Sequence, residues 1–396
     1  MDSCDGEVAW RFGAAKPELA AADGEIRMRA LVSRIYGCVD ASDPRPVVPL
    51  ASGDPTPFAC FRTAPAAEEA VTAAVASGKH NGYPSATGVT EACSAVATYL
   101  SRYLPYELST GYPLYEARAA LSGLKFLHYD LLPEKGWEVD IQGVKALANE
   151  NTVAMVIVNP NNPSGAVYSS HHLAKIAETA RELGIMVISD EVYEHFVFGN
   201  KPFVPMGVFG EIAPVVTLGG ISKRWMVPGW KLGWIAMTDP KGILRKKKIF
   251  ASIIVYRGIS VDPAAIVQGA IPQIIANTDE TFFTNAMNVM RETAEICYQK
   301  LKGIKGVTCP HKPEGSMFVM VKLDMSCFCG IDDDIEFCCK LAKEESVVIS
   351  PGSGLEMKNW LRISIAVDPP LLEDGLERVK SFCLRHVKPI IMNQAS

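Results

Sequence analysis

The chain has 396 residues, 48% of them hydrophobic, with a formal net charge of -5 and a pI near 5.9. This length and apolar fraction predict a globular protein whose core is divided between two domains. The acidic balance excludes a strongly basic face, so nucleic acid is not an expected partner. The 11 cysteines are an odd number and are scattered, which favours reduced thiols over a disulfide framework.

The first 25 residues are rich in Ala, Glu and Asp, and we expect a disordered arm over 1–25. They resemble neither a secretory signal nor an acid-poor transit peptide. No segment approaches the ~18 consecutive apolar residues of a membrane span. We therefore predict a cytoplasmic protein with no membrane partner.

The next segments alternate loops and helices. Residues 43–58 predict a loop with at most one short strand. Pro65 at a first helical position and a stop at Gly78 predict a helix, and a second helix is expected from about Thr90 to Tyr103.

The middle of the chain alternates buried strands with helical segments. A helix is expected over 169–184, with a serine at its start and a glycine at its end. Apolar, β-branched runs predict strands at 153–158, 185–189, 215–219 and 233–237. This alternation predicts an α/β domain with a largely parallel sheet.

Polar side chains follow three of these strands directly: Asn162, Asp190 and Lys223. Ligands of open α/β sheets bind at the carboxyl ends of the strands. We therefore expect these three side chains to share one site.

The rest of the chain predicts a second, α+β domain. A long helical pattern from about Asp279 is followed by strand patterns at 316–324, 346–352 and 360–366. The expected division is a large domain at 62–280 and a small domain that combines 26–61 with 281–396.

Four cysteines cluster in this second region at positions 327, 329, 338 and 339. Their C-x-C and C-C spacings fit no common zinc pattern. We expect small core side chains there and no metal site.

The polar residues form a specific chemical set. A lysine can form a Schiff base with an aldehyde cofactor and then move a proton, while a carboxylate can keep a pyridine nitrogen protonated. An arginine can hold a substrate carboxylate in a planar fork.

Motifs around these residues resemble a known family. "NPNNPSG" with Asn162, "ISDEVY" with Asp190 and Tyr193, and "SKRWMVPGWKLG" with Lys223 are similar to the motifs of class I/II aminotransferases, the fold-type-I pyridoxal-phosphate enzymes. "NWLRI" with Arg362 extends the likeness to the second domain. "LLPEKGWEVD" and "PFVPMGVFG" resemble the plant tyrosine and nicotianamine aminotransferases, and the resemblance covers roughly residues 25–390.

The resemblance implies a catalytic group around the cofactor ring. Lys223 would be the Schiff-base lysine and the acid/base, and Asp190 would pair with the pyridinium nitrogen. Tyr193 and Asn162 would bond the phenolic oxygen of pyridoxal 5'-phosphate, and Tyr112 would stack on its ring.

It also implies substrate and phosphate contacts. Arg362, helped by the backbone around Gly53, would bind the substrate α-carboxylate. Ser222 and Lys231 would contact the cofactor, and Tyr83 would reach across a homodimer interface toward the neighbouring phosphate.

Each residue taken alone has a simpler explanation. Lys223 would be a solvated charge and Arg362 a surface ion pair, but their ordered combination favours the functional interpretation. His195 and the pair His171 and His172 gain no such support, and we expect them at helix caps or on the surface.

Three departures from the family pattern concern the phosphate. Gly220 stands where the family has a serine, and Lys231 stands where it has an arginine, so the charge stays but the planar fork is lost. After Ser109, roughly thirty residues of the pattern are absent, including the helix N-terminus that would hold the phosphate, so the large domain is expected to be truncated near 109–111.

These observations leave three functions open. The first is an aminotransferase that moves the amino group of tyrosine or a related donor, nicotianamine included, to 2-oxoglutarate. The second is a catalytically impaired or non-catalytic homologue that acts as a dimerising protein. The third is a pyridoxal-phosphate lyase that shares the same motifs.

Overall fold

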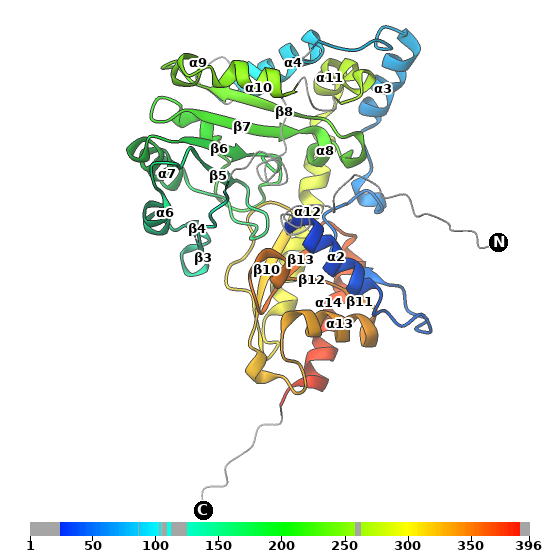
Figure 1. Cartoon of the computed structure of the whole chain (residues 1–396). Coiled ribbons are helices and arrows are strands. Elements are labelled where there is room, and N and C mark those ends of the chain that lie inside the picture. The colour runs from blue at the N-terminus through cyan, green and yellow to red at the C-terminus, as the bar shows by residue number, and fades with distance from the viewer. Residues whose placement is uncertain are drawn as a thin grey trace, which may run out of the picture.

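The computed structural model describes residues 24–85, 87–102, 104, 109–111, 125–257 and 263–388. Its central sheet has five strands in the order β2-β8-β7-β6-β5, seen in the upper half of Figure 1. Strands β5, β6 and β7 are parallel, and β8 runs antiparallel to β7 and β2. The strands span β2 (Ser109–Gly111), β5 (Ala154–Val158), β6 (Met186–Asp190), β7 (Val215–Gly220) and β8 (Gly233–Thr238).

Helices cover both faces of this sheet because its strands are apolar on both sides. On one face, α7 (Ser170–Leu183) packs Leu173 and Ile176 against Val187. On the other face, Val216 and neighbouring side chains pack against α9 (Ile243–Lys246) and α10 (Ile249–Arg257). The predicted caps of α7 are present, since Ser169 accepts the His172 backbone N–H at 3.1 Å and Gly184 has φ 69°.

A further layer lies beside β8. Helix α3 begins at Pro65 and is followed by Gly78 at φ 64°, as the sequence predicts. One core cluster contains side chains of α3 (Pro65–Ser77), α4 (Thr90–Ser101), α8 (Ile221–Arg224) and α11 (Ala265–Asn277). Two buried tryptophans, Trp225 and Trp234, belong to the same cluster.

The C-terminal region builds a second sheet, antiparallel, in the order β12-β13-β10-β9. Figure 1 shows it in the lower half of the view, with the long helix α12 (Glu280–Leu301) running between the two sheets. The other elements are β9 (Val307–Thr308), β10 (Phe318–Leu323), β12 (Ser350–Pro351), β13 (Trp360–Ser364), α13 (Asp334–Glu345) and α14 (Pro369–His386).

The N-terminal segment joins this C-terminal region. Strand β1 (Val48–Pro49) pairs in parallel with β11 (Val347–Val348), and α2 (Gly24–Tyr36) packs Met28 against Gly354. These contacts support the division into 62–280 and 26–61 with 281–396, which we keep as a proposal.

The remaining elements are short. They are β3 (Leu131–Leu132), β4 (Glu138–Val139), α6 (Ile141–Leu147), η1 (Ala59–Phe61), η2 (Pro133–Lys135), η3 (Met206–Phe209), η4 (Pro228–Trp230), η5 (Met325–Cys327) and η6 (Gly352–Leu355).

Several details differ from the sequence predictions. The run at 233–237 forms a strand, but it is antiparallel to its neighbours in the sheet. His172 is buried and not on the surface, because its Nε2 accepts the Val139 backbone N–H at 3.0 Å. Most of the predicted arm at 1–25 lies outside the described residues.

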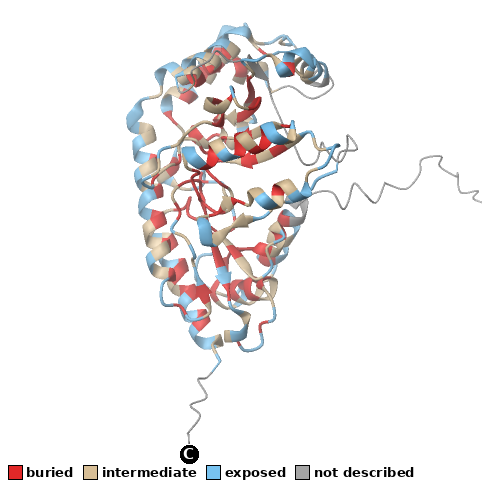
Figure 2. Cartoon of the chain, turned by 90° about the vertical axis from the view of Figure 1, so that its left-hand side faces the viewer, coloured by how far each residue is buried: buried red, intermediate tan, exposed pale blue. Residues whose placement is uncertain are grey.

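Burial follows the layered arrangement. Figure 2 shows buried residues inside, between sheets and helices, with exposed residues on the outer faces. Cys338 lies in the C-terminal core and Cys339 packs against it, whereas Cys329 is exposed. Within the described part of the chain, none of the helices combines the length and apolar character that crossing a membrane would require.

Phe337 tests the C-terminal core. Its ring is fully buried on α13 and makes edge contacts with Phe328 and Phe382, so Phe337→Ala should lower the free energy of unfolding by about 3–5 kcal/mol. Urea titration measures this loss. Leu384→Ala, at a position 68% exposed on α14, should change it by less than about 0.5 kcal/mol. Equal effects of the two changes would contradict this packing.

Candidate active site

The carboxyl ends of three adjacent strands bring the predicted residues to one edge of the central sheet. Asp190 is the last residue of β6 and lies beside Val158, the last residue of β5. Asn162 belongs to the loop after β5. Lys223 lies on α8, which begins directly after β7.

The amine of Lys223 is withdrawn from water into this edge. Its Nζ donates to the Gly53 carbonyl oxygen at 2.9 Å and lies 5.8 Å from the centre of the Tyr193 ring. Burial lowers its pKa, Asp54 opposes this shift, and Arg362 adds to it. A lower pKa enlarges the fraction of neutral amine, which is the nucleophilic form.

Arg362 reaches the same place from β13 of the second sheet. Its Nη1 donates to Asn162 Oδ1 at 3.3 Å, and its guanidinium lies 4.2 Å from the centre of the Phe318 ring. Its Nε is buried and has no hydrogen-bond partner among the described residues, and burial lowers the pKa of the guanidinium. A carboxylate is the group that a guanidinium fits best, and the long contacts of Nη1 and Nη2, at 3.3 and 3.5 Å, can be exchanged for it.

The backbone at 51–53 connects the lysine and the arginine. The Ala51 carbonyl oxygen accepts from Arg362 Nη2 at 3.5 Å, two residues before the carbonyl that accepts from Lys223. A Cβ on Gly53 would lie 2.5 Å from Phe318 Cζ, so only glycine permits this approach without a shift of the ring.

Tyr193 and Asp190 complete the cluster. Burial raises the pKa of Tyr193, and the charge of Asp190 raises it further. Asp190 Oδ1 accepts the Val192 backbone N–H at 3.2 Å, which orients the carboxylate at the strand end.

The other predicted site residues form no hydrogen bond or ion pair with the cluster's side chains in the described part of the chain, or lie outside it. Ser222 is half-buried on α8, and Lys231 is exposed with φ 53°, although its charge still contributes to lowering the pKa of Lys223. Tyr83 is fully exposed in this chain. Tyr112 lies outside the described residues.

Sequence analysis missed Glu191, a carboxyl that is 3% exposed beside Asp190. Its Oε1 accepts the Met206 backbone N–H and the Ser189 hydroxyl, both at 2.8 Å. Burial raises its pKa to about 8. The adjacent acids in "ISDEVY" could have indicated a buried carboxyl. Successive side chains at a strand end point to opposite faces, and both faces of this sheet are covered.

His195, expected at a helix cap or on the surface, is instead half-buried among side chains of other segments. Its Nε2 contacts Tyr99 Oη, Arg224 Nη1 and Glu194 Oε1. Asp54, which opposes the lowered pKa of Lys223, and Phe318, which packs on Arg362, were missed as well, because their roles depend on contacts between distant segments.

Comparison with known proteins gives consistent matches. The family described as aminotransferase class I and II matches residues 106–379. Nicotianamine aminotransferase 1 of Oryza sativa subsp. japonica is 51% identical, with 95% of this chain and 82% of that protein covered. The S-alkyl-thiohydroximate lyase SUR1 of Arabidopsis thaliana is 44% identical, with 96% and 88% covered. The crystal structure of tyrosine aminotransferase from Leishmania infantum has a TM-score of 0.85 and 25% identity, with 96% and 100% covered.

The alignment with the rice protein has more positions than the number of residues of this chain that it includes. It runs over 407 positions but takes in 95% of 396 residues, so about thirty of its positions have no residue in this chain. The placement of such a shortfall after Ser109 stays a prediction.

Glu191→Gln tests the buried carboxyl. In the folded chain the pKa of Glu191 is about 8, above its ordinary value of 4.5. Between these pH values the folded chain therefore holds one more proton than the unfolded chain. Wild-type stability should therefore fall as pH rises from 5 to 8, by about 4 kcal/mol relative to Glu191→Gln, whose amide oxygen can accept the same bonds. Urea unfolding at several pH values measures the difference. Parallel pH profiles would show that Glu191 keeps an ordinary pKa.

Proposed function

Because the chain belongs to the class I and II aminotransferases, which are pyridoxal-phosphate-dependent transaminases, we propose that it transfers the amino group of tyrosine or a related amine donor to 2-oxoglutarate. Nicotianamine is a candidate donor, since relatives named nicotianamine aminotransferase are 50–51% identical. The observation that carries the proposal is the buried, pKa-lowered Lys223 amine beside the unpaired Arg362 Nε.

The residues of this edge fit pyridoxal 5'-phosphate. Among the described residues, Lys223 Nζ has a single hydrogen bond, to a backbone carbonyl, so the amine can be redirected to an aldehyde carbon. Asp190, at the end of β6, would hold the ring nitrogen, and Tyr193 and Asn162 would bond the ring oxygen. When bound, the cofactor supplies an electron sink for the substrate Cα.

The protein side chains divide the remaining work. Arg362 would bind the α-carboxylate of the amino acid, with the backbone near Gly53 lining the same place. Lys223, in its neutral form, would take the proton from the substrate Cα and return it to the cofactor carbon. Its partial burial would limit the access of water to this transfer.

The full exposure of Tyr83 supports a homodimer. An aromatic side chain that is 106% exposed buries apolar area only against another molecule, and a second copy would place it near the neighbouring phosphate. Lys231 and Ser222 would contact the phosphate of their own subunit. The cytoplasmic location stays a prediction.

Lys223 gives the direct test of cofactor binding. The purified chain with pyridoxal phosphate should show the visible absorption band of a lysine-linked cofactor, and Lys223→Ala should abolish it. Lys175→Ala, at an exposed position on α7, is the matched control and should retain the band. Absence of the band at saturating cofactor would favour the non-catalytic homologue.

Addition of substrate distinguishes an aminotransferase from a lyase. Tyrosine, or nicotianamine, should convert the lysine-linked band to the amino form of the cofactor and release a keto acid, and 2-oxoglutarate should restore the band. A lyase would release a cleaved fragment instead, which is relevant because some relatives are named lyases. Product analysis by mass spectrometry distinguishes these outcomes.

Lys231→Arg tests the phosphate contact. An arginine at this exposed position should restore a planar, two-bond contact and tighten cofactor binding about tenfold. Fluorescence titration with pyridoxal phosphate measures the affinity. Lys241→Arg, also exposed, should leave it unchanged. Unchanged or weaker affinity of the Lys231 variant would place Lys231 away from the phosphate.

A further inference from the structure

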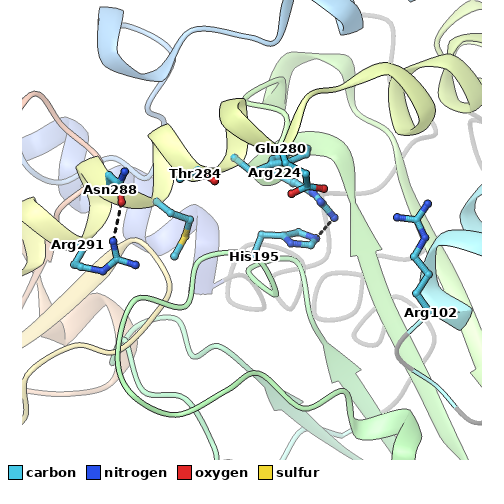
Figure 3. Close-up of a pocket in the computed structure, with 9 residues that line it drawn as sticks. Arg102, His195, Arg224, Glu280, Thr284, Asn288 and Arg291 are labelled. Carbon is cyan, nitrogen blue, oxygen red and sulfur yellow. Dashed lines mark hydrogen bonds between the residues drawn. The ribbon is translucent and has the colours of Figure 1, made fainter.

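A cavity of about 340 Å³ lies along the N-terminal half of α12, and none of its lining residues has a role in the proposed reaction. We call it the α12 groove. Figure 3 shows its side chains arriving from α12, from α8, from the end of α4 and from the loop after β6. The lining residues are Arg102, His195, Arg224, Glu280, Phe283, Thr284, Met287, Asn288 and Arg291.

The groove is elongated because it follows one face of a helix. The lining residues of α12 recur at intervals of three and four from Glu280 to Arg291, which marks a single stripe. At 1.5 Å per residue this stripe is about 16 Å long. Figure 3 shows Arg291 toward one end, Arg224 in the middle and Arg102 toward the other end.

The groove carries more positive than negative charge. Among the described residues, none of the three arginines forms an ion pair: Arg291 donates to the Asn288 side chain at 2.8 Å, and Arg102 lies over the Tyr99 ring at 5.7 Å. Glu280 is the single acid among the described residues that line it. Within the described lining, three arginines therefore face one acid.

Arg224 in the middle is held rigidly by its surroundings. It is only 8% exposed, its guanidinium lies 4.0 Å from the centre of the Phe283 ring, and its Nη1 contacts His195. Burial lowers its pKa to about 9, and the charge of Glu280 opposes that shift. A buried cation of this kind gains stability from an added anion.

A second carboxylate, that of Glu194, also contacts His195 and Tyr99. Glu194 Oε1 accepts from Tyr99 Oη at 2.9 Å and lies 2.8 Å from His195 Nε2. These hydrogen bonds leave the negative charge of Glu194 in place, but the three arginines of the groove still outnumber Glu194 and Glu280.

We propose that the α12 groove binds a small polycarboxylate, a molecule with several carboxylates spread along its length. A cavity of about 340 Å³ is within the size range of small-molecule sites. Arginines that reach the groove from three different elements suit several separated carboxylates better than one compact phosphate. An organic acid and a short acidic peptide share this chemistry.

Calorimetric titration of the full chain, loaded with pyridoxal phosphate at fixed ionic strength, tests the groove with citrate and tri-glutamate as probes. Tri-glutamate should bind, while tri-glutamine, of the same length without charge, should not. Inorganic phosphate should bind at least about tenfold more weakly. Stronger binding of citrate than of tri-glutamate would contradict a ligand with its carboxylates spread along its length, and the reverse would identify an acidic peptide as the ligand class.

Variants locate the binding. Arg102→Gln and Arg291→Gln, both at exposed positions, should each weaken binding about five- to tenfold. Arg181→Gln, an exposed arginine on α7, should have no effect. Arg362→Leu should retain binding, which separates the groove from the proposed substrate site. Wild-type affinity in both groove variants, or loss of binding in Arg362→Leu, would overturn the proposal, as would no binding of either acid.

Discussion

The site depends on keeping one amine out of water. Burial of Lys223 costs free energy in its charged form, so the fold lowers its pKa and enlarges the fraction of neutral amine, the form that attacks a carbonyl and accepts a proton. The strand ends place this amine beside Asp190 and Tyr193, and β13 brings Arg362 to it from the second sheet. Both sheets contribute to the proposed site, because the central sheet would supply the base and the C-terminal sheet would supply the guanidinium that binds a carboxylate.

The sequence predicted the fold well where patterns are local. Apolar runs located β5, β6 and β7, and terminal signals such as Pro65 and Gly78 gave the bounds of helices. The direction of β8 could not be predicted, because an apolar run reads the same in a parallel or an antiparallel pair.

Local sequence patterns predicted only part of the candidate site. Lys223, Asp190 and Asn162 follow strands, so their shared edge follows from the order of elements. The contacts of Gly53 with Phe318 and of Arg224 with His195 join segments far apart in the chain, and no local pattern carries them. Family resemblance added the roles of these residues, which remain proposals, and pointed to the altered phosphate contacts at Gly220 and Lys231.

The central claim is that Lys223 is the residue that holds the cofactor. Borohydride reduction of the protein loaded with pyridoxal phosphate, followed by digestion and peptide mass spectrometry, tests it most directly. The account predicts one reduced cofactor per chain, attached to the peptide that contains Lys223. Attachment spread over exposed lysines such as Lys175, or no attachment at saturating cofactor, would contradict it.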